Sequence, residues 1–426
     1  MKYDEIRKRG WKILKLKDIC IQITDGTHKT PNYVEKGTPF ISTQNLKPFS
    51  KTFDFSQYKK FISQEEHNFL IKRCNPEKGD ILLSKCGTIG RAQVVRVDYT
   101  FSLFVGVALL KLNKKEVSCD FLEQLLNFPP IVKKMKRSSP GSTRKTLTIR
   151  AIENLLLPLP PLPEQKKIAE ILGSVDEAIE ITDKEIEKVE RLKKGLMQEL
   201  LTRGIGHKKF KKTEIGIIPE EWEVVRLGNY IDVFSGYAFK REDFLANKSK
   251  GIPIIKIGNL QNGKVIIDDK TSFVRRDFYE KLVDFQLHYG DVLIALSGAT
   301  TGKIAVVDKD IGLALVNQRV GKFKILSSHI SQKFFSFLAQ SDSFMKFVLR
   351  NIGQSAQGNL SPNQVKKSKI PLPPLPEQRK IAEILSGVDE LLETLRSRKE
   401  ELQRLKKGLM EDLLTGKRRV KINGNA

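Results

Sequence analysis

Two basic segments that lack acidic residues occupy matching positions in the two halves of the chain. Residues 131–150 contain seven Lys or Arg side chains, residues 343–369 contain five, and neither segment contains Asp or Glu. Cations interleaved with Ser, Thr, Gln and Asn suit a DNA duplex, because cations bind phosphates while amide and guanidinium groups can read base edges. We therefore interpret both segments as DNA-contacting loops. The alternative interpretation is a pair of solvated loops without a ligand.

Other polar loops and glycine turns extend this predicted DNA-binding surface. They lie at residues 24–33, 42–45 and 85–88 of the first half and at residues 235–243, 256–259 and 297–303 of the second. The loops differ in sequence between the halves, so one scaffold used twice would read two different half-sites. The predicted contacts of the first half are Thr27, His28, Lys29, Thr43, Gln44, Asn45, Lys85, Thr88, Arg144 and Lys145. Those of the second half are Tyr237, Lys240, Lys256, Asn259, Ser297, Thr300, Thr301, Lys303, Gln354, Gln357 and Asn359.

The overall charge points to the same class of ligand. The chain has 75 Lys and Arg against 50 Asp and Glu, which gives a formal net charge of +25. A surplus of this size favours a polyanionic partner, and double-stranded DNA is the first candidate.

The motifs of catalysis and metal binding are missing from the sequence. The five histidines are scattered, and no HxxxH or HxH pair occurs. The stretch GATTGKI at residues 298–304 is one residue short of a phosphate-binding loop and ends in Ile304. We therefore expect no catalytic residue, no metal site and no cofactor bound by this chain.

A nearly identical stretch occurs twice and determines the predicted architecture. Residues 158–202 align without a gap to residues 371–415, and 29 of the 45 positions are identical. Self-similarity at a fixed offset indicates a duplicated unit. Each copy follows a region of β-rich runs and helical stretches, so we predict an α+β protein with two similar mixed α/β domains.

Each copy also predicts a stiff joint followed by a long helix. The PLPPLPEQ segment is extended because of its prolines, and Pro163 and Pro376 suit the first turn of a helix. Apolar residues then recur with heptad spacing, interrupted at Thr182, Lys193, Lys399 and Lys406. We expect the two helices to form an antiparallel, pseudo-twofold coiled coil with the globules at opposite ends.

The predicted organisation has five parts. They are a first recognition domain at 1–157, a spacer helix at 158–203, a second recognition domain at 204–370, a C-terminal spacer helix at 371–416 and a basic tail at 417–426. The helix ends match more closely than their middles, which suggests docking sites for two copies of one partner. The predicted docking residues are Glu164, Gln165, Arg191, Lys193, Lys194, Glu377, Gln378, Arg404, Lys406 and Lys407.

Cysteine usage and hydropathy indicate the compartment. The four cysteines form no CxxC pair, and no apolar run approaches the roughly 20 residues that span a bilayer. We expect a cytoplasmic protein without a membrane partner.

Several of these motifs together resemble a known family. The PLPPLPEQ helix, its RLKKGLM end, the turns GDILLSKCGTIG and GDVLIALSGATTG, and DGTH at 25–28 are similar to those of the DNA-specificity (S) subunit of type I restriction–modification systems. The resemblance covers essentially the whole chain. It implies two target-recognition domains, an asymmetric bipartite DNA target, and spacer helices that bind two methyltransferase subunits. It also implies restriction/translocase subunits as partners, with AdoMet, ATP and Mg²⁺ bound by the partner subunits.

Two other functions remain open from the residues. One is a coiled-coil adaptor whose basic charge is incidental, and it predicts no DNA affinity at moderate salt. The other is an enzyme that modifies nucleic acid through an unrecognised site, and it predicts turnover by the chain alone.

Overall fold

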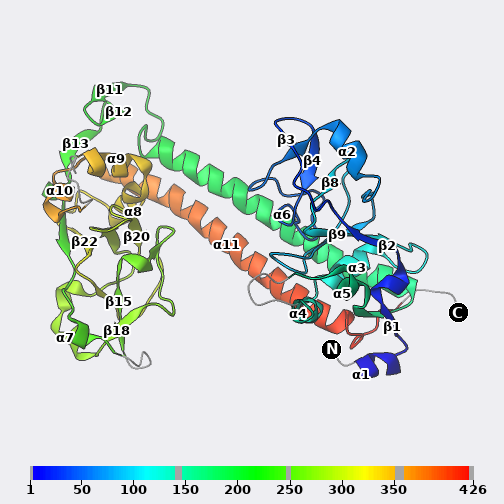
Figure 1. Ribbon diagram of the computed structural model, residues 1–426. Coiled ribbons are helices and arrows are strands. Elements are labelled where there is room, and N and C mark those ends of the chain that lie inside the picture. The colour runs from blue at the N-terminus through cyan, green and yellow to red at the C-terminus, as the bar shows by residue number, and fades with distance from the viewer. Residues whose placement is uncertain (1–2, 140–145, 246–250, 351–358, 422–426) are drawn as a thin grey trace. The chain divides into compact units, whose positions relative to one another are not determined.

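The protein consists of two compact units that share both long helices. The computed structural model describes residues 3–139, 146–245, 251–350 and 359–421. Unit 1 contains residues Met1–Glu185 and Leu395–Ala426, and unit 2 contains residues Ile186–Thr394. Each unit therefore combines one domain with part of α6 (Leu162–Leu200) and part of α11 (Leu375–Leu413), which are green and orange in Figure 1.

Two four-stranded sheets form the domain of unit 1. The first has the order β2 (Cys20–Asp25), β9 (Val107–Leu112), β6 (Ile81–Ser84) and β7 (Ala92–Val94), and all its pairs are antiparallel. The second has the order β3 (Tyr33–Val34), β5 (Phe61–Ile62), β4 (Thr38–Ile41) and β8 (Ser102–Leu103). Strands β6 and β9 are apolar and almost completely buried, which explains their continuous hydrophobic runs.

Short helices complete this domain. They are α1 (Tyr3–Lys8), α2 (Gln64–Leu70), α3 (Cys119–Leu126), α4 (Pro129–Arg137) and α5 (Ile149–Glu153). Ser118 is the N-cap residue of α3, and its hydroxyl accepts a hydrogen bond from the backbone N–H of Phe121. The helical stretch expected after the last strand is therefore present, divided into α3 and α4 by Asn127 and Phe128.

The domain of unit 2 repeats this plan with different sheet sizes. Its larger sheet has the order β14 (Ile231–Ser235), β22 (Val320–Ile325), β19 (Val292–Ala295), β20 (Ile304–Val306), β17 (Lys264–Val265) and β16 (Leu260–Gln261). Its smaller sheet has the order β18 (Ser272–Val274), β15 (Ile252–Ile255) and β21 (Leu315–Val316). The helices are α7 (Asp277–Lys281), α8 (Gln332–Gln340), α9 (Asp342–Arg350) and α10 (Pro362–Lys366), and a hairpin of β11 (Phe210–Thr213) and β12 (Gly216–Pro219) precedes the domain.

The proline-rich segments are extended, as predicted, and they are also paired. β10 (Leu156–Leu159) lies antiparallel to β1 (Lys12–Lys15), and β23 (Lys369–Leu372) lies antiparallel to β13 (Glu223–Arg226). The prediction of a stiff, extended joint did not include this pairing. Each segment is therefore tied to the strand that opens its domain, directly before the long helix begins.

The two long helices run antiparallel within each unit. In unit 1, Lys406 Nζ lies 2.5 Å from Asp176 Oδ1, and one heptad further Lys399 Nζ lies 2.5 Å from Asp183 Oδ1. In unit 2, Lys193 pairs in the same way with Asp389. The polar interruptions of the heptad seam are thus explained, because three of the four are interhelical ion pairs. The fourth, Thr182, is buried and donates its hydroxyl hydrogen to the Ala178 carbonyl.

The core of each unit includes both long helices. In unit 1, Ile168 and Leu172 of α6 and Leu413 of α11 pack into the same cluster as the sheet residues. In unit 2, Leu200 of α6 and Ile381 of α11 do so. The helices are therefore integral parts of both domains.

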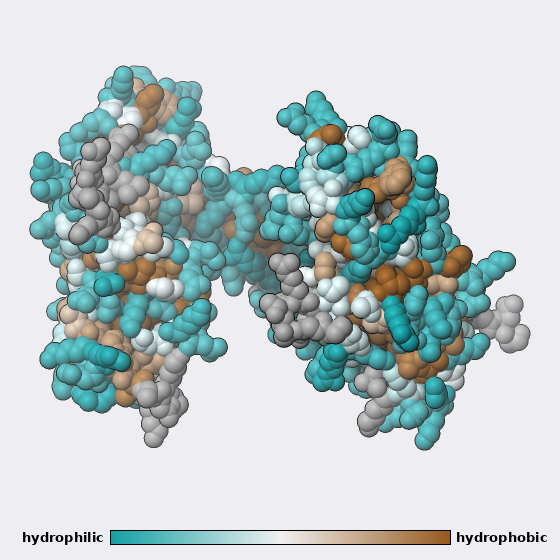
Figure 2. Space-filling model, in the orientation of Figure 1, coloured by the Kyte–Doolittle hydropathy of each residue, from teal (hydrophilic) through white to brown (hydrophobic). Residues whose placement is uncertain are grey.

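One face of the molecule is drawn by hydropathy in Figure 2. On the face drawn in Figure 2, hydrophilic side chains cover most of each unit, with small hydrophobic areas between them. In the described ranges, no helix combines the length and apolarity needed to cross a membrane.

Candidate nucleic-acid interface

The predicted contact loops of unit 1 converge on one segment, residues 103–106. The Thr27 N–H donates to the Leu103 carbonyl, and the Val105 N–H donates to the Thr27 carbonyl. The Lys85 N–H donates to the Gly106 carbonyl, and the Lys85 carbonyl accepts the Leu147 N–H at 2.7 Å. Loop 24–29, the glycine turn and the end of the basic segment are therefore neighbours.

Unit 2 brings the equivalent loops together with the same bonds. The Tyr237 N–H donates to the Val316 carbonyl, and the Gln318 N–H donates to the Tyr237 carbonyl. The Leu296 carbonyl accepts the Leu360 N–H at 2.8 Å, as Lys85 accepts Leu147 in unit 1. The same scaffold therefore presents loops of different sequence in each unit.

Most of the predicted contacts lie at or near the surface. The exposed ones are His28, Lys29, Gln44, Thr88, Lys240, Thr300 and Asn359. The half-buried ones are Thr27, Thr43, Tyr237, Lys256, Ser297, Thr301 and Lys303. Arg144, Lys145, Gln354 and Gln357 lie outside the described residues.

Asn45 and Asn259 are interior residues, which corrects the prediction that they face a ligand. The Asn45 amide accepts the Ser42 N–H and donates to the carbonyls of Asp54 and Tyr58. The Asn259 amide accepts the Lys256 N–H and donates to the Ile266 carbonyl and the Thr271 hydroxyl. Both side chains are buried with their hydrogen bonds satisfied, so the two matching asparagines hold their turns in shape.

Lys85 is also an interior residue rather than a surface contact. Its side chain is 8% exposed, and its Nζ lies 2.5 Å from Asp25 Oδ2. The Ser297 hydroxyl points inward as well, because its oxygen is buried without a hydrogen-bond partner among the described residues. We predicted both residues as contacts because glycine turns are usually exposed. The side chains of Lys85 and Ser297, which lie at these turns, point into their domains instead.

Lys256 is held against an aromatic ring beside its turn. Its Nζ lies 4.1 Å from the centre of the Phe244 ring and donates a hydrogen bond of 2.8 Å to the Ser272 hydroxyl. Burial lowers the pKa of Lys256. The lysine is therefore oriented by its own unit before any ligand arrives.

Two of the predicted docking residues, Gln165 and Gln378, are completely buried. Gln165 accepts the Ser118 N–H and donates to the carbonyls of Glu116 and Pro160. Gln378 makes the equivalent three bonds, with the Ser331 N–H and the carbonyls of His329 and Pro373. Their identity in the two copies therefore reflects one internal joint, between the start of the long helix and the start of α3 or α8.

Glu164 and Glu377 also serve internal contacts rather than docking. The Glu164 carboxylate accepts two hydrogen bonds from one edge of the Arg419 guanidinium, from Nε at 2.6 Å and from Nη2 at 2.8 Å. The Glu377 carboxylate accepts the Trp222 indole N–H at 2.9 Å and the Ile205 N–H at 2.9 Å, and it lies 2.9 Å from His207 Nε2. Both carboxylates thus bind the segment that follows the other long helix.

The remaining docking residues form one surface that occurs twice. Lys193 and Lys406 belong to the interhelical ion pairs, whereas Arg191, Lys194, Arg404 and Lys407 are exposed. Each exposed pair flanks a leucine, Leu192 or Leu405, and both leucines are 52% exposed. We call residues 191–194 and 404–407 the paired helix patches.

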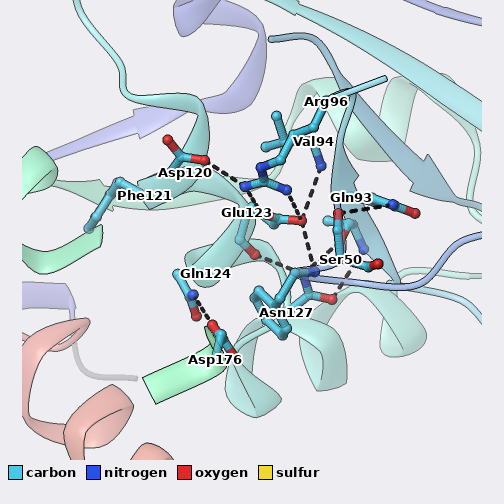
Figure 3. Close-up of polar contacts among 12 residues, drawn as sticks. Ser50, Gln93, Val94, Arg96, Asp120, Phe121, Glu123, Gln124, Asn127 and Asp176 are labelled. Carbon is cyan, nitrogen blue, oxygen red and sulfur yellow. Dashed lines mark hydrogen bonds and ion pairs between the residues drawn. The ribbon is translucent and has the colours of Figure 1, made fainter. Parts of the chain in front are cut away.

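A buried ionic network fixes α3 against the sheet and against α6 in unit 1 (Figure 3). Glu123 Oε1 accepts the N–H groups of Phe49 and Val94, and Glu123 Oε2 lies 2.6 Å from Arg96 Nη2. Burial disfavours the charged guanidinium, but the hydrogen bonds and the charge of Glu123 outweigh it and raise the pKa of Arg96. Gln124 donates to Asp176 at 2.6 Å, which links α3 to α6. This network holds α3 in place within unit 1.

Metal ligands do not cluster in the described ranges. No group of three or more His, Cys, Asp or Glu side chains there could hold a metal ion. Burial raises the pKa of the Cys20 and Cys74 thiols to about 12, so both remain protonated at neutral pH and are poor metal ligands.

Comparison with known families identifies the duplicated scaffold. A model of the type I restriction modification DNA specificity domain matches the chain twice, at residues 8–191 and 219–404. The chain belongs to the type I restriction–modification specificity family. Each match covers one domain and most of the helix that follows it.

Individual relatives agree with this assignment. The chain is 34% identical over 388 residues to the type I restriction enzyme MjaVIII specificity subunit of Methanocaldococcus jannaschii, covering 90% of this chain and 86% of the relative. It is 32% identical to the putative type I restriction enzyme MjaX specificity subunit of the same organism, covering 96% and 94%. A crystal structure of the S subunit from M. genitalium has the same fold, with a TM-score of 0.59 at 16% identity and coverage of 95% and 96%.

Proposed function

We propose that this chain is the non-catalytic DNA-reading subunit of a type I restriction–modification complex. Each unit would read one half of an asymmetric bipartite target. The observation that carries the proposal is the convergence of loops with different sequences at the same place on two copies of one scaffold. Exposed lysines, a histidine and hydroxyl or amide groups in these loops supply the chemistry for phosphate and base-edge contacts.

The partner subunits would supply catalysis. In this proposal two methyltransferase subunits bind AdoMet, and restriction/translocase subunits bind ATP and Mg²⁺. The chain itself would position them on the DNA in the cytoplasm.

The paired helix patches are the proposed docking surface for the two methyltransferase subunits. An exposed leucine between cations offers an apolar anchor with a charged rim, which is a typical arrangement at protein interfaces. Because the patch occurs once on each long helix, one kind of partner surface could bind twice. This proposal replaces the ten docking residues of the sequence prediction with the exposed ones.

Modified-base mapping tests the proposed function directly. We expect loss of this gene in its host to abolish methylation at one gapped, asymmetric motif, as measured by single-molecule sequencing of genomic DNA. Restoring the gene should restore methylation at the same motif. Unchanged methylation in the deletion strain, with the partner genes expressed, would contradict the proposal.

Substitution of the exposed leucines tests the docking surface. Leu192→Asp and Leu405→Asp should each weaken binding of one methyltransferase copy at least tenfold, because each places a carboxylate in an apolar contact. Native mass spectrometry should then show complexes with one copy, and the double variant should carry none.

Ile181→Asp is the matched control for the leucine variants. Ile181 lies on the same helix and is 50% exposed, but the equivalent residue of the second helix is Thr394. The control should retain two copies. Two copies in the double leucine variant would rule out this docking surface.

A further inference from the structure

A cluster of cationic side chains surrounds one buried carboxylate beside the first reading loop. The carboxylate is that of Asp25, the last residue of β2. Asp25 Oδ2 lies 2.5 Å from Lys85 Nζ, and Asp25 Oδ1 lies 2.7 Å from Arg73 Nη2 and 3.3 Å from His28 Nε2. The three partners come from loop 24–33, the segment after α2 and the turn after β6.

The partners differ in exposure in a way that assigns them different roles. Lys85 is buried beside Asp25, so this pair alone neutralises the buried carboxylate. Arg73 and His28 are about 60% exposed, with side-chain exposures of 59% and 61%. The charge of Arg73 is therefore not needed to neutralise Asp25, and it remains available to a ligand at the surface.

The geometry leaves most of the Arg73 guanidinium free for a ligand. Among the described residues, the Arg73 side chain donates one hydrogen bond, from Nη2 to Asp25, whereas a guanidinium has five N–H donors. A planar fork with free donors matches the oxygens of a phosphate group. Within the described residues, the cluster carries two permanent cations and one histidine against a single carboxylate.

We propose that Arg73 binds a phosphodiester group of the DNA backbone, with Asp25 and Lys85 as its positioning residues. The inference rests on the proposed function and adds a contact that no sequence motif indicates. Arg73 and His28 both contact Asp25 Oδ1, and the main chain of Thr27 is fixed to Leu103 and Val105. The site would therefore set the register of the first recognition domain on the duplex while loop 24–29 faces the bases.

The backbone around Asp25 supports a fixed site. Any side chain at Gly26 would collide with the Leu103 carbonyl, because a Cβ built there lies closest to that oxygen. Glycine is thus required for loop 24–29 to approach strand β8 so closely. The carboxylate at the preceding position is held in place together with the loop.

The test uses the full chain in complex with its methyltransferase subunits and a random-sequence DNA duplex. We expect Arg73→Gln to lower the affinity about three- to tenfold, and to reduce by about one the slope of log affinity against log salt concentration. Arg73→Lys should restore the slope because it restores the charge. Fluorescence anisotropy over a series of salt concentrations measures both quantities.

Arg7→Gln is the matched control, because Arg7 has 62% side-chain exposure and pairs with an exposed carboxylate, that of Asp4. It should leave both affinity and slope unchanged. A wild-type slope in Arg73→Gln, with wild-type protein binding normally, would overturn the phosphate assignment. Failure of the wild-type complex to bind any duplex would instead overturn the proposed function, and the assignment with it.

Discussion

The Arg419→Gln variant is expected to lose about 2 to 3 kcal/mol of unfolding free energy. The Glu164 carboxylate is only 1% exposed, and Arg419 donates a hydrogen bond to each of its oxygens. Removing one partner of a buried ion pair costs roughly 3–5 kcal/mol because it leaves an uncompensated charge. We place the effect just below this range because the Arg419 side chain is 47% exposed and water can replace part of it. Chemical denaturation of the full chain measures the loss.

Two further variants make this prediction specific. Arg418→Gln removes the neighbouring arginine, whose exposed pair with Asp412 should contribute less than about 1 kcal/mol. The double variant Arg419→Gln with Glu164→Gln should recover much of the lost stability, because it removes the buried charge as well. Equal losses in the Arg418 and Arg419 variants would contradict a structural role for the Glu164 pair.

The Glu123→Gln variant is expected to lose about 3 kcal/mol of unfolding free energy. An amide at this position can still accept hydrogen bonds through its oxygen, but its NH₂ group would face the Arg96 guanidinium, donor against donor. If the amide turns the other way, its NH₂ group faces the Phe49 and Val94 N–H groups, which share the other carboxylate oxygen, and the loop and the edge strand β7 are disturbed instead. Thermal and denaturant unfolding of the variant chain measure the effect.

Asp120→Asn is the control for this variant because it contacts the same guanidinium at the same distance. Arg96 Nη2 lies 2.6 Å from both carboxylates, but the Asp120 side chain is 55% exposed and the Glu123 side chain is 2% exposed. The control should therefore lose less than about 1 kcal/mol. A similar loss in both variants would mean that burial of Glu123 does not strengthen this network.

Sequence periodicity predicted the long helices themselves but not the ion pairs between them. The heptad spacing and Pro163 and Pro376 predicted both helices and their starts, because these features depend on the local chain alone. Lys193 and Lys406 could be recognised only as departures from the seam. Their partners, Asp389 and Asp176, follow from the register of one helix against the other, which no local pattern contains.

Repetition of a residue proved a poor guide to its exposure. Gln165 and Gln378 are identical in the two copies, and we predicted them to dock a partner. Each is instead buried against an earlier segment of the chain. Gln165 contacts Ser118, which lies 47 positions before it, and Gln378 contacts His329, which lies 49 positions before it. Whether a polar side chain points to solvent or to such a segment depends on the tertiary fold, so the sequence could not distinguish the two.

The glycine turns and polar loops of the candidate DNA interface were predictable as loops, but their individual side chains were not. The prediction that residues 131–150 and 343–369 are loops was wrong in part, because α4 and α5 occupy part of the first segment and α9 and α10 part of the second. Glycine turns and polar segments identified the regions that meet near residues 103–106 and 316–318, because turn residues mark loops reliably. The individual roles of Asn45, Lys85 and Arg73 required the fold. Arg73 follows α2 and carries no recognisable motif, so only its distance to Asp25 connects it with the reading loop.

The division of the chain into units has a consequence for the order in which the protein can mature on the ribosome. Unit 2 is one continuous run, Ile186–Thr394, whereas unit 1 joins Met1–Glu185 to Leu395–Ala426. Met410, Leu413 and Leu414 belong to the core of unit 1, so the domain translated first cannot close its core until these residues have emerged. Unit 2 can close earlier, although it begins later. A nonsense or frameshift mutation shortly before codon 410 would therefore damage the domain built from residues before Ile186.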